Sequence, residues 1–206
     1  MKKGVFIVID GIGGTGKSTQ LELLKGHLPS DTVFTHEPGG APRAEKIRAI
    51  LKEGDGQAVD PLADFFLFWA ARAEHVATRI RPALSEGKIV VSDRFDSSTY
   101  AMQVIGEQKE DLESFFWECR KATLEGATPD CYIILDADAS ITEKRRAKRV
   151  PYEDRFDDRN AEYQARIREG YKEFAKKVGG SVIDAGRTPK EVDADIVNYI
   201  QRFIEK

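Results

Sequence analysis

Cysteine and long apolar runs are scarce in this 206-residue sequence. The two cysteines, Cys119 and Cys131, lack metal-site spacing and an accompanying group of histidines, so we expect reduced packing residues and neither a disulfide nor a catalytic thiol. No apolar stretch approaches the roughly 18 residues that a membrane-spanning helix requires, and the first residues carry no signal-peptide pattern. These absences predict a cytoplasmic protein with no membrane partner.

An excess of positive charge is also missing, because 32 lysines and arginines face 35 aspartates and glutamates, for a net charge of -3. A protein that binds the phosphate backbone of DNA or RNA needs a basic excess, so no nucleic acid polymer is expected as a partner. The composition, 41% hydrophobic and 33% charged, is typical of a globular chain that can bury a full core.

Glycine, by contrast, is concentrated in one short segment. Residues 11–18 read G-I-G-G-T-G-K-S, a phosphate-loop pattern set between the apolar run 5–9 and a helix-like segment. The backbone N–H groups of such a loop form an anion site, the lysine reaches the β- and γ-phosphates, and the serine hydroxyl can ligate Mg²⁺. This pattern predicts binding of a nucleoside triphosphate through Gly11, Ile12, Gly13, Gly14, Thr15, Gly16, Lys17, Ser18 and Thr19.

Apolar runs and helical segments alternate along the whole chain. The runs predict strands at 5–10, 32–35, 88–93, 131–136 and 181–184. The helical segments are 17–27, 41–52, 60–85, 97–104, 109–125, 140–149, 158–178 and 189–204. We therefore expect an α/β protein with the P-loop NTPase fold, a five-stranded parallel sheet flanked by helices in one domain over 1–206. A short lid is expected at about 148–158, where a charged segment contains Pro151.

The predicted strand 88–93 ends in an acid that is followed by a base, Asp93 and Arg94. The carboxyl ends of parallel strands face the ligand crevice, so both side chains are expected to point at the phosphates. Asp93 suits the Mg²⁺ shell, directly or through water, and Arg94 can bind two phosphate oxygens. The alternative for Asp93 is an N-cap of the helix at 97–104.

Arginines flank the expected lid. Arg145 and Arg149 are four residues apart and share a helix face, and Arg155 follows in the lid itself. Phosphoryl transfer gains from positive charge and from a lid that excludes water, so we expect at least one of the three to stabilise the transferred group. A solvated helix face is the alternative for most of this basic set.

Phe68 and Arg72 lie four residues apart in an aromatic-rich helical segment. On one helix face they would place a flat ring beside a forked donor, the combination that stacks on a nucleobase and binds its edge. The alternative is that this aromatic stripe packs in the core.

Taken together, these segments resemble thymidylate kinase, a branch of the P-loop nucleoside monophosphate kinases, over almost the whole chain. The markers are the phosphate loop, Glu37-Pro38-Gly39-Gly40 followed by Arg48, Phe68 with Arg72, Asp93-Arg94-Phe95 with Ser98 and Gln103, and Asp154-Arg155-Phe156-Asp157. The resemblance implies that Mg-ATP donates its γ-phosphoryl group to the 5′-phosphate of dTMP, giving dTDP and ADP. Members of the family are commonly homodimers, so a homodimer is expected.

The resemblance also implies residue roles. It assigns thymine stacking to Phe68, the base edge to Arg72, and the acceptor phosphate to Arg48 and Arg94. Asp10 would help organise Mg²⁺, together with Ser18 and Asp93. The catalytic residues implied are Lys17, Arg94, Asp10 and the lid arginines Arg145, Arg149 and Arg155. The nucleotide pocket would further include Glu37, Pro38, Ser98, Thr99, Met102 and Gln103.

This sequence departs from the family pattern at three positions and leaves two related activities open. Gly13 stands where an acid is usual, His36 where an arginine is usual, and Met102 where an aromatic is usual. The alternatives are a deoxynucleoside kinase and a nucleoside monophosphate kinase of broader specificity. A GTPase-type switch is excluded because no Asn-Lys-x-Asp tetrad occurs.

Overall fold

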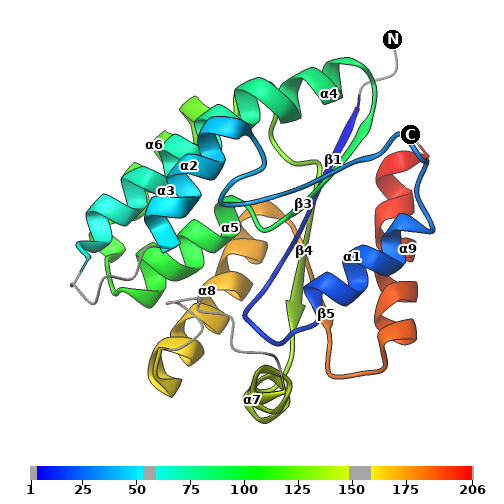
Figure 1. The fold of residues 1–206 in the computed structure, drawn as a ribbon. Helices are drawn as coiled ribbons and strands as arrows, with labels where there is room; N and C mark the ends of the chain where they lie inside the picture. The colour runs from blue at the N-terminus through cyan, green and yellow to red at the C-terminus, as the bar shows by residue number, and fades with distance from the viewer. Residues whose placement is uncertain (1–3, 53–58, 149–158, 206) are drawn as a thin grey trace.

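The structure is a computed structural model that describes residues 4–52, 59–148 and 159–205. Within these ranges, five parallel strands form one sheet in the order β2-β3-β1-β4-β5 (Figure 1). The strands are β1 (Val5–Asp10), β2 (Val33–His36), β3 (Ile89–Asp93), β4 (Cys131–Asp136) and β5 (Ser181–Asp184). Each lies within one residue of its predicted position, and the predicted α/β fold with a parallel sheet is confirmed.

Helices cover both faces of the sheet, which explains why the strand sequences are almost continuously apolar. Phe6 and Val8 of β1 pack on one face in a core with the helices α3, α6 and α8, and Ile7 and Ile9 pack on the other face against α1 and α9. Figure 1 shows α1 and α9 together on one side of the sheet and the remaining large helices on the other. The bounds are α1 (Lys17–Lys25), α2 (Pro42–Lys52), α3 (Pro61–His75), α6 (Glu113–Thr123), α7 (Ala139–Ala147), α8 (Ala161–Val178) and α9 (Pro189–Ile204).

Two predicted helices differ from the structure in their internal geometry. The single helix expected at 60–85 is wrong in its middle, where a π-helical turn at Val76–Ile80 joins α3 to α4 (Arg81–Ser85). Pro82 causes the irregularity, because it has no N–H to donate and its ring collides with the carbonyl four residues earlier. The helix expected at 97–104 is a short α5 (Asp96–Thr99) that continues as a π-helical segment, Tyr100–Gly106.

The segment expected at 109–125 begins with a 3₁₀ turn, Glu110–Leu112, before α6. The helix predicted at 140–149 ends at Ala147, and residue 149 lies outside the described ranges, as does almost all of the expected lid. No helix in the described part of the chain is long and apolar enough to cross a membrane. Cys131 lies inside β4, where burial raises the pKa of its thiol to about 12, which agrees with a packing role.

The register of the sheet places the functional segments together, at the carboxyl ends of neighbouring strands. In the pairing of β1 with β3, Ile9 lies opposite Asp93, so both strands end side by side. The phosphate loop follows β1 directly, and the residue pair 93–94 closes β3. The site is therefore built at the carboxyl ends of the two central strands, the usual ligand edge of a parallel sheet.

Candidate active site

The phosphate loop is packed so closely that two of its glycines cannot be replaced. Gly11 has φ 139°, and a Cβ there would lie 2.3 Å from the carbonyl oxygen of Leu135. Gly14 has φ 87°, and a Cβ would lie 2.5 Å from the carbonyl oxygen of Thr142 in α7. Other side chains are excluded at both positions by backbone conformation and by space.

Lys17 begins α1 and folds back over the loop. Its Nζ donates to the carbonyl oxygens of Gly11 at 2.8 Å and of Ile12 at 3.1 Å. The Thr15 hydroxyl also donates to the Ile12 carbonyl, at 2.9 Å. The lysine charge is thus held at the mouth of the loop, whereas Ser18 and Thr19 are exposed at the start of the helix.

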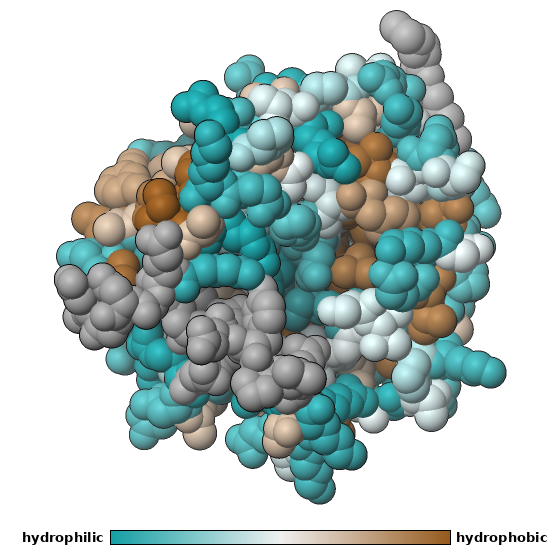
Figure 2. Space-filling model, viewed as in Figure 1, coloured by the Kyte–Doolittle hydropathy of each residue, from teal (hydrophilic) through white to brown (hydrophobic). Residues whose placement is uncertain are grey.

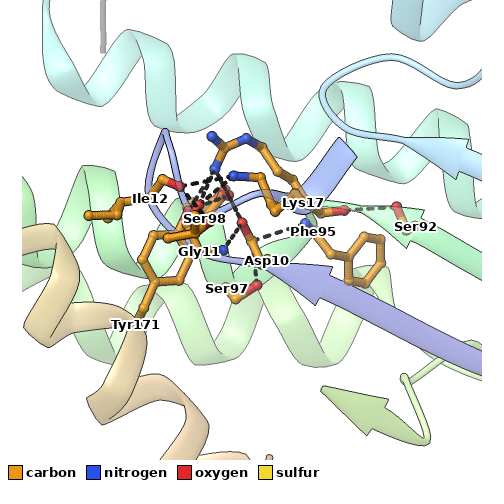
Figure 3. Close-up of polar contacts among 12 residues, drawn as sticks. Asp10, Gly11, Ile12, Lys17, Ser92, Phe95, Ser97, Ser98 and Tyr171 are labelled. Atoms are coloured by element: carbon orange, nitrogen blue, oxygen red, sulfur yellow. Dashed lines mark hydrogen bonds and ion pairs between the residues drawn. The ribbon is translucent and has the colours of Figure 1, made fainter. Parts of the chain in front are cut away.

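Asp10, the last residue of β1, is fully buried and is the centre of a polar network (Figure 3). Its two carboxylate oxygens accept hydrogen bonds from the backbone N–H groups of Gly11 and Phe95, the hydroxyls of Ser97 and Ser98, and the guanidinium of Arg94. A carboxylate has about four acceptor sites, and these donors occupy them. The network favours a role in which Asp10 holds Arg94 and the start of α5, and through them helps to organise the site, over direct contact with a metal ion.

Arg94 has an unusual backbone conformation for a residue with a side chain. Its φ of 66° lies in the left-handed region, which costs energy and is concentrated at functional sites. Its N–H donates to the carbonyl of Ile9 at 3.0 Å, and its own carbonyl accepts from the Ser92 hydroxyl at 2.7 Å. The two central strands therefore hold the strained residue in place. Its Nη1 donates to Asp10, Gly11, Ser98 and Tyr171 at 2.9 to 3.3 Å.

Tyr171 of α8 belongs to this network although no motif marked it. Its hydroxyl accepts from Arg94 at 2.9 Å and lies 2.8 Å from the Ser98 hydroxyl. Burial, and then the nearby charge of Asp10, raise the pKa of Tyr171 well above its ordinary value, so the hydroxyl keeps its proton. In the sequence it reads only as a core residue of an amphipathic helix.

Asp93 ends β3 with one oxygen buried and unsatisfied. Its Oδ1 has no hydrogen-bond partner within the described ranges. The N-cap of α5 is Phe95 and involves no side-chain hydrogen bond, so the capping alternative for Asp93 is wrong. A buried oxygen that is free to accept fits the expected role near Mg²⁺.

Arg72 lies almost fully buried in α3 and is held on several sides. Its Nε donates to Glu37 Oε2 at 2.8 Å, and its Nη2 donates to the Thr99 hydroxyl at 3.1 Å. The guanidinium lies 4.6 Å from the ring centroid of Trp69 and 5.2 Å from that of Phe95. Its Nη1 has no partner among the residues that the structure describes.

Gln103, Phe68 and Met102 of the expected pocket are all mostly buried. Both amide atoms of Gln103, Oε1 and Nε2, are buried and without a partner in the described part of the chain. Phe68 is 7% exposed, so it is mostly packed, and Met102 is 6% exposed in a cluster with Ile12 and Tyr171. The core alternative therefore accounts for most of the surface of Phe68, and Met102 is likewise mostly packed.

The turn after β2 carries further expected residues. The peptide between Glu37 and Pro38 is cis, and the carbonyl of Pro38 accepts a hydrogen bond from Arg48 in α2. Glu37 is buried and also contacts His75, which the sequence analysis did not single out.

Arg145 is half-buried and lies behind the phosphate loop. Its Nη1 donates to the carbonyl of Ala185 at 2.9 Å and lies 3.5 Å from the carbonyl of Gly14. Together with Thr19, Arg187 and Pro189 it lines a cavity of about 240 Å³ between the loop and the connection from β5 to α9. Arg149 and Arg155 lie outside the described residues, so their expected roles stay predictions.

The sheet topology, the phosphate loop after the central strand and the cations gathered around it define a P-loop kinase of small nucleotides. The family profile described as Thymidylate kinase matches residues 9–196. The thymidylate kinase of Chromobacterium violaceum is 37% identical over 100% of this chain and 98% of that protein, and that of Symbiobacterium thermophilum is 36% identical over 98% and 95%. The crystal structure of thymidylate kinase from Ehrlichia chaffeensis matches with a TM-score of 0.77 at 29% identity, covering 97% of this chain and 99% of that one.

The chain therefore belongs to the thymidylate kinase family, and the resemblance seen in the sequence is confirmed. Family membership makes it a nucleotide kinase.

Proposed function

We propose that this chain transfers the γ-phosphoryl group of ATP to the 5′-phosphate of dTMP, giving dTDP and ADP. One observation carries the proposal beyond the family assignment. Lys17 Nζ and Arg94 Nη1 both donate to the carbonyl oxygen of Gly11, at 2.8 and 3.2 Å. Lys17 belongs to the phosphate loop after β1, and Arg94 follows β3. The two positive charges are therefore brought together at the carbonyl of Gly11. Transfer between two phosphates requires this arrangement.

The donor nucleotide is proposed to bind the phosphate loop and the adjoining cavity. The cavity is lined by Gly14, Thr15 and Gly16 of the loop and by Arg145 and Arg187. This geometry supports a role for Arg145 in holding the donor, in addition to the expected stabilisation of the transferred group. Backbone N–H groups and the start of α1 supply the anion site itself.

Mg²⁺ is proposed to bind through the Ser18 hydroxyl and Asp93, with phosphate oxygens and water as further ligands. In the described residues no group of three or more His, Cys, Asp or Glu could hold a metal by itself. Mg²⁺ commonly uses only one or two carboxylates beside the phosphates, and the unpartnered Oδ1 of Asp93 fits that pattern. When bound, Mg²⁺ would supply positive charge that offsets the negative charge of the phosphates.

The acceptor base is proposed to lie against Phe68, with its edge toward Arg72 and Gln103. Thymine presents carbonyl oxygens and a ring N–H, so it needs both donors and an acceptor. Arg72 Nη1 and the two amide atoms of Gln103 are buried and have no other partner in the described residues. A buried polar group without a partner costs about 1–3 kcal/mol, which a matching ligand recovers.

The reaction needs no dedicated base. A phosphate monoester has a second pKa near about 6, so the acceptor is mostly dianionic at neutral pH. One acceptor oxygen bonds to the γ-phosphorus while the bond to the β–γ bridging oxygen breaks and ADP leaves. The protein has to neutralise repulsion between the two anions, align them and exclude water, which Lys17, Arg94 and the lid arginines are suited to do.

We also propose a homodimer in the cytoplasm. Leu62 and Phe66 of α3 and Phe115 of α6 are 42%, 50% and 37% exposed, and the rings of Phe66 and Phe115 meet edge to face at 6.0 Å. Figure 2 shows an apolar area on the side of the molecule that carries α2, α3 and α6, and a second one on the side of α1 and α9. Light scattering should give twice the chain mass, and Phe66→Glu should give monomers. A monomeric wild-type protein would contradict the homodimer.

The proposed activity is tested by ADP release from Mg-ATP with a panel of acceptors. We expect release with dTMP and none with thymidine, because Arg94 binds a phosphate. Turnover of thymidine would instead indicate a deoxynucleoside kinase. Equal turnover of dTMP, dUMP and dGMP would indicate the broader monophosphate kinase, and no turnover of any acceptor would overturn the proposal.

A further inference from the structure

His75, the last residue of α3, is fully buried and contacts the site from behind. Its Nδ1 lies 2.9 Å from Glu37 Oε1 and its Nε2 lies 2.7 Å from the hydroxyl of Thr35. A proton on Nδ1 satisfies both contacts, since Nδ1–H then donates to the carboxylate and Nε2 accepts from the hydroxyl. The ring thus ties the end of β2 to the acidic residue of the following turn.

Glu37 is held by two residues of the same helix face. Arg72 Nε donates to its Oε2 at 2.8 Å, and His75 contacts its Oε1 at 2.9 Å. Arg72 and His75 are three residues apart in α3, so they reach the carboxylate side by side. The side chains of all three are no more than 4% exposed, which leaves water little access to replace a missing partner.

The turn after β2 is folded tightly around the imidazole. A Cβ on Gly40 would lie 2.4 Å from His75 Nε2 and 2.6 Å from the Thr35 hydroxyl. The same turn includes Pro38, whose carbonyl accepts from Arg48. The ring therefore supports the segment on which both Arg72 and Arg48 depend.

We propose that His75 is a positioning residue for the acceptor nucleotide. Its Nδ1–H orients Glu37, Glu37 fixes the Nε edge of Arg72, and the guanidinium is left with Nη1 as the donor for the base. The inference rests on the proposed function, in which Arg72 binds the edge of thymine. It predicts that the hydrogen bond from Nδ1 sets dTMP affinity, and that the shape of the ring alone does not.

A pair of amide substitutions separates the two nitrogens. In His75→Asn the amide nitrogen occupies the place of Nδ1 and can still donate to Glu37. In His75→Gln the longer side chain reaches toward Thr35 but has no donor at the position of Nδ1. Each variant removes one contact and most of the ring, so a packing role predicts similar losses for both.

The readout is the KM for dTMP beside the KM for ATP and kcat. We expect His75→Gln to raise the KM for dTMP about tenfold and His75→Asn to raise it less than about threefold. Neither should change the KM for ATP more than about twofold. His27→Gln is the matched control, because His27 pairs with Asp193 on the surface and should leave all three constants unchanged.

Equal increases in the KM for dTMP in both variants, or a parallel increase in the KM for ATP, would overturn the positioning role. Should His75→Gln not fold, His75→Asn alone decides, since a packing role predicts a clear loss of dTMP affinity there. An assay of the wild-type enzyme distinguishes failure of the proposed function from failure of the role of His75. If it does not phosphorylate dTMP, the proposed function fails, and if it does so while the variants show no split, only the role of His75 fails.

Discussion

At the phosphate end of the site, both oxygens of Asp10 are occupied by protein donors, whereas at the base end Arg72 Nη1 and both amide atoms of Gln103 are buried without a partner in the described residues. The Asp10 network is satisfied by donors of the protein itself. The base end leaves polar groups that a ligand can satisfy.

The difference separates rate from selectivity. Groups held rigidly by a satisfied network need no reorganisation when charge moves during the transfer, so the phosphate end should control kcat. Buried donors and acceptors that stay unpaired with a wrong ligand penalise that ligand, so the base end should control the choice of acceptor.

The largest effect is expected at the phosphate end, from Lys17→Ala. The lysine supplies positive charge to the phosphates and takes no part in core packing, so kcat should fall at least about 10³-fold. Its Nζ donates to two loop carbonyls outside the apolar core, so circular dichroism should stay unchanged. A folded variant with more than about a tenth of wild-type turnover would break the assignment of the loop.

Asp10→Asn tests whether the network itself matters for rate. The substitution keeps the shape but removes the charge that holds Arg94, and it places an amide N–H against existing donors. We expect kcat to fall about 10²-fold with a smaller change in the KM for ATP. Ser97→Ala is the comparison, because it removes only one donor to Asp10 Oδ2 and should cost less. Similar losses in the two variants would show that rate does not depend on the charge of Asp10.

At the base end, Gln103→Leu should make the protein more stable but weaken the binding of dTMP. Removing a buried amide without a partner should stabilise the protein by about 1 kcal/mol and raise the melting temperature. The KM for dTMP should rise about tenfold, while kcat falls less. A lower melting temperature, or an unchanged KM, would mean that the amide is satisfied within the protein and does not await the base.

The sequence predicts the fold and several residues of the phosphate end and the base end, but it does not predict which of their polar groups are satisfied within the protein. The five strands were predicted because a sheet covered on both faces leaves continuous apolar runs, and the phosphate loop was predicted because its glycines have a fixed spacing. Lys17, Asp93 and Arg94 follow from their place at strand and loop ends. Side chains that meet across the fold leave no such pattern.

Tyr171 and His75 illustrate why. Tyr171 contacts Ser98 and Arg94 from a helix position 77 residues along the chain from Arg94. His75 lies three residues from Arg72, but its partners come from β2 and the turn after it. The saturation of the Asp10 carboxylate likewise depends on donors from two segments, Gly11 and residues 94–98. Such contacts are properties of the tertiary structure, and local periodicity does not contain them.

An ion pair between α6 and α8, which shares no residue with the Asp10 network, offers a test in which stability changes and kinetics do not. Glu113 of α6 accepts hydrogen bonds from Tyr100 and Trp117 and pairs with Lys177 of α8 at 2.9 Å. The hydrogen bond from Lys177, followed by those from Trp117 and Tyr100, lowers the pKa of the Glu113 carboxyl below its ordinary value. Because the folded pKa is depressed, the pair stabilises the protein above about pH 4.5 and loses that effect as the pH falls further.

Glu113→Gln should therefore cost about 0.5–1 kcal/mol at pH 7, a small value because both side chains are partly exposed. The difference from wild type should shrink toward zero as thermal unfolding is followed down to about pH 3. The exposed Glu118 on the same helix gives the matched control, Glu118→Gln, which should show no such convergence. With kcat and both KM values unchanged, the result would show that the effects at Asp10 and Gln103 are local. Unfolding curves that stay parallel at every pH would instead mean that Glu113 acts through packing and carries no charge-dependent stability.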